Sequence, residues 1–142
     1  RKVFHCQAKN NESEALPLYN SLAYYYAEEG KESNKSKSKD LMQQALYAQN
    51  LTLANLKNEL TYSGEPNTDH IEEKLYAETL RLYSYRDTLG YVCIRFAETT
   101  QDVNEGLIWC KESLAYTNDD LLYEKHEKAA KNFKQKQATE PH

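Results

Sequence analysis

The sequence predicts an all-α protein built from antiparallel helical hairpins, and two observations lead to this prediction. The 142 residues include four Gly and three Pro, too few for a β sandwich, which needs a turn about every 8–12 residues. Two similar helical segments also recur about 67 residues apart, one over 18–50 and the other over 85–118. Such internal similarity is typical of stacked hairpins, in which neither hairpin buries its apolar face alone.

The first hairpin is expected to follow an extended or frayed lead-in over residues 1–12. Its first helix should begin near Ser13, a suitable cap, with Pro17 in the first turn and Gly30 at its end. The stretch Lys31–Lys39 contains no apolar residue and is predicted to be a mobile connector. A second helix over Lys39–Thr61 follows, because apolar residues recur there at helical spacing.

Gly64 and Pro66 predict a turn over Tyr62–Thr68. The next stretch, Asp69–Glu98, contains no proline and a single glycine. We predict one helix there, with two helices broken near residues 84–87 as the alternative. Packed against the long second helix, it would form a lengthened antiparallel hairpin.

A link over Ala97–Glu105 leads to a helix predicted for Val103–Tyr116. Asn118 or Asp119 is expected to cap a last helix that ends near Lys136 and covers the apolar end of the array, as terminal repeats do. The sequence therefore predicts one helical domain over residues 13–136, followed by a tail over 137–142.

The two similar segments resemble the tetratricopeptide repeat, whose first helix carries an aromatic residue, a Leu-Gly pair and a tyrosine, and whose second helix carries small residues. In the first copy the matching residues are Tyr19, Leu22, Ala23, Tyr26, Gly30 and Ala45. In the second they are Leu89, Gly90, Gly106 and Ser113, whereas Arg86 and Cys93 depart from the pattern. The resemblance implies a right-handed superhelical array of about five helices with a C-terminal capping helix.

In that family the first helix of each hairpin lines a concave surface that binds partners. Six residues are implied by position as partner-binding: Asn20, Tyr24, Asp87, Tyr91, Ile94 and Arg95. Tyr24 and Tyr91 are equivalent in the two copies, so the resemblance implies a tyrosine-lined groove. Five other tyrosines are expected to pack between helices instead: Tyr19, Tyr26, Tyr47, Tyr76 and Tyr116.

Composition narrows the function classes. The net charge of −4 and a pI near 5.6 lack the basic character expected of a nucleic-acid-binding protein, and no stretch is apolar enough to span a membrane. Cys6, Cys93 and Cys110 have no CxxC spacing, and the four histidines are scattered. We therefore expect no cofactor and no metal. A cytoplasmic location is favoured.

No nucleotide-binding, metalloprotease or nucleophile-elbow motif occurs in the sequence. We therefore expect a non-catalytic module that binds a peptide or a partner protein in the tyrosine-lined groove. The alternative is a regulatory or oligomerisation domain of a larger signalling protein, whose long second and third helices form a homo-oligomer. An exposed strip of Leu51, Leu53 and Leu56 would favour that alternative.

Overall fold

A computed structural model describes residues 2–62, 64 and 68–139, and the side chains from Glu14 onward within these ranges. Over the described residues the chain forms five α-helices and one short 3₁₀ helix. Their bounds are α1 Lys2–Glu29, η1 Glu32–Asn34, α2 Lys35–Tyr62, α3 Asp69–Arg95, α4 Thr100–Thr117 and α5 Asp120–Thr139. The prediction of an all-α protein is confirmed, and Asp69–Arg95 is one helix.

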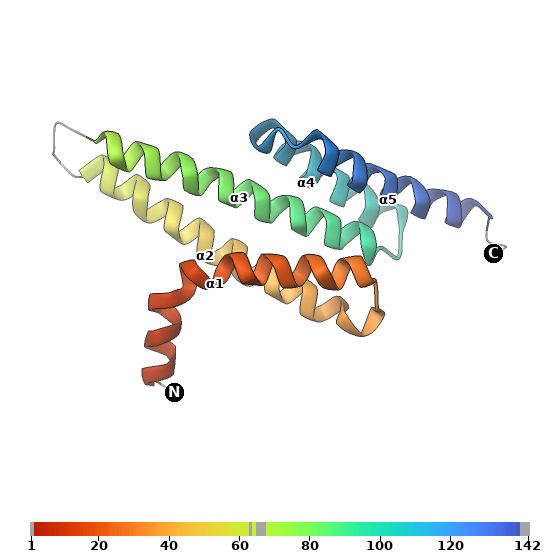
Figure 1. Cartoon of the computed structure of the whole chain (residues 1–142), viewed down its shortest axis with the longest axis horizontal. Coiled ribbons are helices and arrows are strands. Elements are labelled where there is room, and N and C mark those ends of the chain that lie inside the picture. The colour runs from red at the N-terminus through yellow and green to blue at the C-terminus, as the bar shows by residue number, and fades with distance from the viewer. Residues whose placement is uncertain (1, 63, 65–67, 140–142) are drawn as a thin grey trace.

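The helices pack mainly as adjacent antiparallel pairs. Each α-helix contacts the next one along the chain, and α3 also contacts α1 and α5. Figure 1 shows α2 and α3 as a long hairpin, with α1 lying along α2 on one side and α4 and α5 gathered at the end of α3. The central position of α3 brings residues from α1, α3, α4 and α5 to a single region.

Two boundaries differ from the sequence prediction. The first helix begins at Lys2, earlier than the expected start at Ser13. The connector predicted for Lys31–Lys39 is mostly helical, because η1 and the first turns of α2 occupy it. A tertiary contact fixes this segment: Ser38 is fully buried, and its hydroxyl donates a 2.9 Å hydrogen bond to the Ala23 carbonyl of α1.

Two glycines bring α3 and α4 into close contact. A Cβ added at Gly90 would lie 2.5 Å from the carbonyl oxygen of Gly106, and a Cβ at Gly106 would lie 2.5 Å from that of Gly90. Only residues without a side chain permit such an approach between two helix backbones. These two glycines therefore set the distance at which α4 packs on α3.

Local hydrogen bonds define the ends of α4 and α5. Thr99 and Asp102 form a capping box at the start of α4, in which each side chain accepts a bond from the backbone of the other. Asn118 ends α4 in the left-handed region at φ 55°. The Asp119 carboxylate accepts a 3.1 Å bond from the Leu122 N–H at the start of α5, so Asp119 is the predicted cap. The tail predicted for 137–142 begins inside α5, and residues 140–142 lie outside the described residues.

Two apolar clusters form the described core. The larger joins α1, α2 and α3 around Leu16, Met42 and Val92, and the smaller joins α3, α4 and α5 around Val103 and Cys110. The expected packing of three tyrosines between helices is wrong. Tyr47 and Tyr76 lie on outward faces and Tyr116 stacks on Tyr83 at the surface; their exposed fractions are 70%, 67% and 45%.

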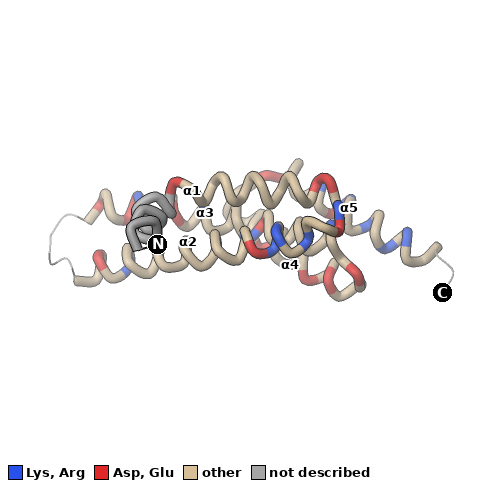
Figure 2. The backbone as a smooth tube through the Cα atoms, turned by 90° about the horizontal axis from the view of Figure 1, so that it is seen from below, with Lys and Arg blue, Asp and Glu red and all other residues tan. Residues whose placement is uncertain are grey.

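None of the described helices is long and apolar enough to cross a membrane. Figure 2 shows the lysines of α5 spaced along its C-terminal part, whereas acidic residues are spread over the remaining helices. Lysines are therefore frequent along α5, and α2 and α3 also carry basic residues, such as Lys35 and Arg95.

Candidate functional site

Three aromatic rings from α1, α3 and α5 form a compact cluster in which Tyr24 and His126 both stack on Tyr91 and are tilted relative to each other. The Tyr24 and Tyr91 rings are 4.7 Å apart with planes inclined by 24°, so the two predicted groove tyrosines do meet. The His126 imidazole of α5 then stacks on Tyr91 at 4.4 Å and 21°. His126 is fully buried and Tyr91 is 3% exposed. In this conformation α5 thus covers the tyrosine surface on which the sequence predicts a partner.

An ion pair closes the outer side of this ring cluster. Lys125 of α5 donates to the carboxylate of Glu28 at the end of α1, and its ammonium lies 5.2 Å from the Tyr24 ring centre. Tyr91 donates a 3.0 Å hydrogen bond to the same carboxylate. These contacts fix α5 against α1 and α3 above the stacked rings.

The pKa values of this group reflect burial and mutual contact. Burial, followed by the hydrogen bond to Glu28, raises the pKa of Tyr91 to about 12. Desolvation alone would raise the pKa of Glu28, but hydrogen bonds from Lys125 and Tyr91 bring it below its usual value. The hydrogen bond to Glu28 raises the pKa of Lys125. Glu28 and Lys125 are therefore charged, and Tyr91 is protonated, at neutral pH.

The two remaining residues predicted on α3 have structural surroundings. Ile94 is 2% exposed and belongs to the α3–α4–α5 core cluster. Arg95 donates a 2.9 Å bond from Nε to the Ala27 carbonyl and a 3.1 Å bond to the Glu28 carbonyl. It thereby satisfies two carbonyls at the C-terminus of α1, where a cation is also favoured by the helix dipole.

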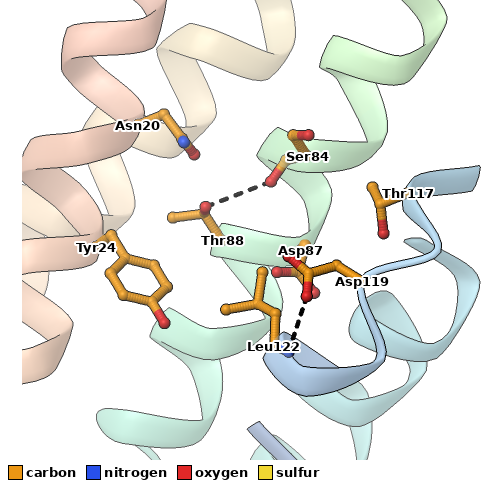
Figure 3. Close-up of a pocket in the computed structure, with 8 residues that line it drawn as sticks. All are labelled: Asn20, Tyr24, Ser84, Asp87, Thr88, Thr117, Asp119 and Leu122. Atoms are coloured by element: carbon orange, nitrogen blue, oxygen red, sulfur yellow. Dashed lines mark hydrogen bonds between the residues drawn. The ribbon is translucent and has the colours of Figure 1, made fainter. Parts of the chain in front are cut away.

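A pocket of about 360 Å³ opens beside the stacked tyrosines, between α1, α3 and the turn from α4 to α5. It contains three of the predicted residues, namely Asn20, Tyr24 and Asp87. Figure 3 shows its lining, in which every side chain but that of Leu122 carries a polar group: Asn20, Tyr24, Ser84, Asp87, Thr88, Thr117, Asp119 and Leu122. The structure brings three of the six predicted residues to this pocket and leaves Tyr91, Ile94 and Arg95 out of its lining.

Two features of this lining favour a positively charged ligand. Among the described residues that form it, the two charged side chains, Asp87 and Asp119, are both acidic. The buried side-chain oxygen of Asn20 has no hydrogen-bond partner in the part of the chain that the structure describes. A hydrogen-bond donor that carries positive charge would satisfy the amide oxygen and both carboxylates.

Asp87 also reaches a second, buried group of polar side chains. Its Oδ1 lies 3.4 Å from His126 Nδ1, and Cys110 Sγ lies 3.4 Å from the same nitrogen. The three donor atoms all lie within 4.8 Å of one another. Cys110 Sγ donates to the Asp87 backbone carbonyl at 3.6 Å, while Tyr24 Oη lies 3.3 Å from the other ring nitrogen, Nε2.

The sequence prediction missed Cys110 and His126. Cys110 is fully buried, and its pKa is raised by burial and then by Asp87. The relevant signal was His126, one turn from Leu122 and from Ala129 on the apolar stripe of the last helix. A histidine on such a face needs a polar partner, but separations of 16 residues from Cys110 and 39 from Asp87 do not identify one.

Comparison with protein-family models, with curated proteins and with solved structures finds no match. The argument for function therefore depends on the geometry of this chain.

Proposed function

We propose that this chain is a non-catalytic protein-interaction module that resembles a tetratricopeptide-repeat array and holds a basic side chain of its partner in the pocket beside Tyr24. The observation that carries the proposal is the pocket itself. It combines two carboxylates, the unpaired Asn20 oxygen and one aromatic ring.

The repeat part of the proposal is supported by matching contacts in the two hairpins. Ala23 and Gly90 are equivalent by the offset of 67, and Ser38 and Gly106 by an offset of 68. In the first hairpin the Ser38 hydroxyl touches the Ala23 carbonyl; in the second, Gly106 touches Gly90. In each hairpin the two helices thus contact each other through a pair of small residues. This is expected if one ancestral hairpin was duplicated into a right-handed superhelical array.

The chemistry of the pocket suits arginine or lysine. Arginine carries five N–H donors in a plane, and a carboxylate can bind it through two parallel hydrogen bonds. Tyr24 and Leu122 also line the pocket, and they can pack against the aliphatic part of the side chain. The volume of about 360 Å³ is at the lower end for a ligand site, which suits one side chain better than a folded segment.

A nuclear magnetic resonance titration with a capped glycyl-arginyl-glycine peptide tests this proposal. We expect amide shifts that saturate and map to the lining, and we expect none with the same peptide carrying citrulline, the neutral isostere. A lysine peptide forms the second arm and separates recognition of the guanidinium plane from recognition of charge alone. Shifts spread evenly over the surface, or equal binding of the citrulline peptide, would refute the proposal.

Asp119→Asn is the variant for this test, because asparagine preserves the cap of α5 while it removes the charge. We expect it to weaken arginine binding at least fivefold. The matched control is Asp120→Asn, which removes the same charge from the next residue, outside the lining. Equal effects of the two variants would indicate general electrostatic attraction.

The alternative of a regulatory or oligomerisation domain stays a prediction. Leu53 and Leu56 are 6% and 5% exposed, because they pack inside the chain, and Leu51 alone of the three is exposed. The leucine strip that would favour self-association is therefore mostly used within the monomer. A monomeric mass at high concentration in sedimentation would exclude this alternative.

A further inference from the structure

We propose that Asp87, Cys110 and His126 bind a zinc ion. The three residues come from α3, α4 and α5, they are all buried, and one donor atom from each lies within 4.8 Å of the other two. Thiolate, imidazole and carboxylate are the side chains by which proteins bind zinc. This inference does not rest on the proposed peptide binding, although Asp87 belongs to both sites.

The distances fit a tetrahedral site. With bonds of about 2.0 Å to nitrogen and oxygen and about 2.3 Å to sulfur, the edges of a tetrahedron are about 3.3 Å between N and O and about 3.5 Å between N and S. The observed separations from His126 Nδ1 are 3.4 Å to Asp87 Oδ1 and 3.4 Å to Cys110 Sγ. Rotation of the Asp87 carboxylate can adjust the third edge, which is at most 4.8 Å.

The direction of the contacts also favours an ion over a proton relay. In a cysteine–histidine–aspartate relay the thiol and the carboxylate contact opposite nitrogens of the imidazole. Here both face Nδ1, so the three donors converge on one point. Nε2 faces the Tyr24 hydroxyl at 3.3 Å. When Nδ1 binds the metal, Nε2 keeps its proton and can donate it to Tyr24, which orients the ring as an outer-shell partner.

Charge and access are consistent with this site. A thiolate and a carboxylate together balance the two positive charges of Zn²⁺, so the buried centre is neutral. Asp87 also lines the pocket beside Tyr24, so one of the three ligands borders an opening to solvent. Three protein ligands leave the fourth position of the tetrahedron for a water molecule.

The test is a titration of the full, chelator-treated chain with Co²⁺, followed by displacement with Zn²⁺. We expect saturation at one equivalent, a near-ultraviolet thiolate-to-cobalt absorption and visible bands of tetrahedral intensity, all removed by Zn²⁺. The absence of the thiolate band, or a spectrum typical of six oxygen ligands, would overturn the proposal. Both results are obtained with the unaltered chain, so they do not depend on how a variant folds.

Substitutions then identify the ligands. The double variant Cys6→Ser/Cys93→Ser leaves Cys110 as the sole thiol and should keep the full spectrum. Cys110→Ser should lose the thiolate band, and Asp87→Asn and His126→Gln should each weaken Co²⁺ binding at least tenfold, with circular dichroism checking the fold. Loss of the band in the double variant, or its persistence in Cys110→Ser, would overturn the assignment.

Discussion

Gly90→Ala is the sharpest test of the packing between α3 and α4. The added methyl group would lie 2.5 Å from the Gly106 carbonyl oxygen, 2.7 Å from Cys110 Sγ and 3.0 Å from Trp109 Cβ. The first of these atoms belongs to the backbone of α4 and cannot rotate away. The substitution therefore forces the two helices apart.

The size of the stability loss caused by Gly90→Ala follows from two opposing effects. Overpacking of a core costs about 1–3 kcal/mol, and a backbone contact places this substitution near the upper value. Alanine is better than glycine inside a helix by about 1 kcal/mol, which offsets part of the cost. We expect a net loss of about 2 kcal/mol and, for a chain of this size, a fall in Tm of about 6–8 °C.

Thermal unfolding followed by circular dichroism measures this loss. Gly106→Ala should have a similar effect, since its methyl group would meet the Gly90 carbonyl oxygen at 2.5 Å. The double variant should lose less stability than the two single variants lose together, because helices that are already forced apart accommodate the second methyl group. Asn104→Ala, on the exposed face of α4, is the control for helix propensity. A Tm of Gly90→Ala that equals or exceeds that of the unaltered chain would refute the close contact.

Three further predictions concern single side chains. Arg95→Met should lower the free energy of unfolding, measured in urea, by about 1–2 kcal/mol, because two carbonyls of α1 lose their hydrogen-bond donor. Asp102→Asn should lower the free energy of unfolding by about 1 kcal/mol at neutral pH. Backbone hydrogen bonds lower the pKa of Asp102, so this difference should persist down to about pH 4, the ordinary aspartate value, and disappear below it as the folded carboxyl is protonated. Tyr24→Phe should keep the ring stack but weaken Co²⁺ binding about tenfold.

The sequence predicts the helices better than it predicts the residues between them. Periodic apolar positions and missing breakers identify α2 through α5, including the single long helix α3. The stretch Lys31–Lys39 was misjudged because its helical turns depend on tertiary contacts. Ser38 bonds to Ala23, and Lys35 pairs with Glu98 at 2.7 Å, 63 residues away. Neither partner can be recognised from local composition.

The site was predictable only along α1 and α3. The resemblance of the two similar segments to the tetratricopeptide repeat implied Asn20, Tyr24 and Asp87 as binding residues, and these three do line the pocket. The path of α5 could not be derived from its own pattern. A cap that only covers apolar residues needs no histidine, whereas the observed α5 inserts His126 between Tyr91 and Cys110.

Because Asp87 belongs to both the pocket and the donor cluster, zinc and a basic peptide should compete. A bound Zn²⁺ would occupy one of the two carboxylates offered to the peptide and add positive charge beneath it. Binding linkage requires the effect to be reciprocal. Saturating Zn²⁺ should weaken binding of the arginine peptide about fivefold or more. The saturating peptide should weaken binding of Zn²⁺ by the same factor. Calorimetric titrations in both orders measure the two factors. Peptide binding that is unchanged by Zn²⁺ would mean that the peptide does not use the Asp87 carboxylate.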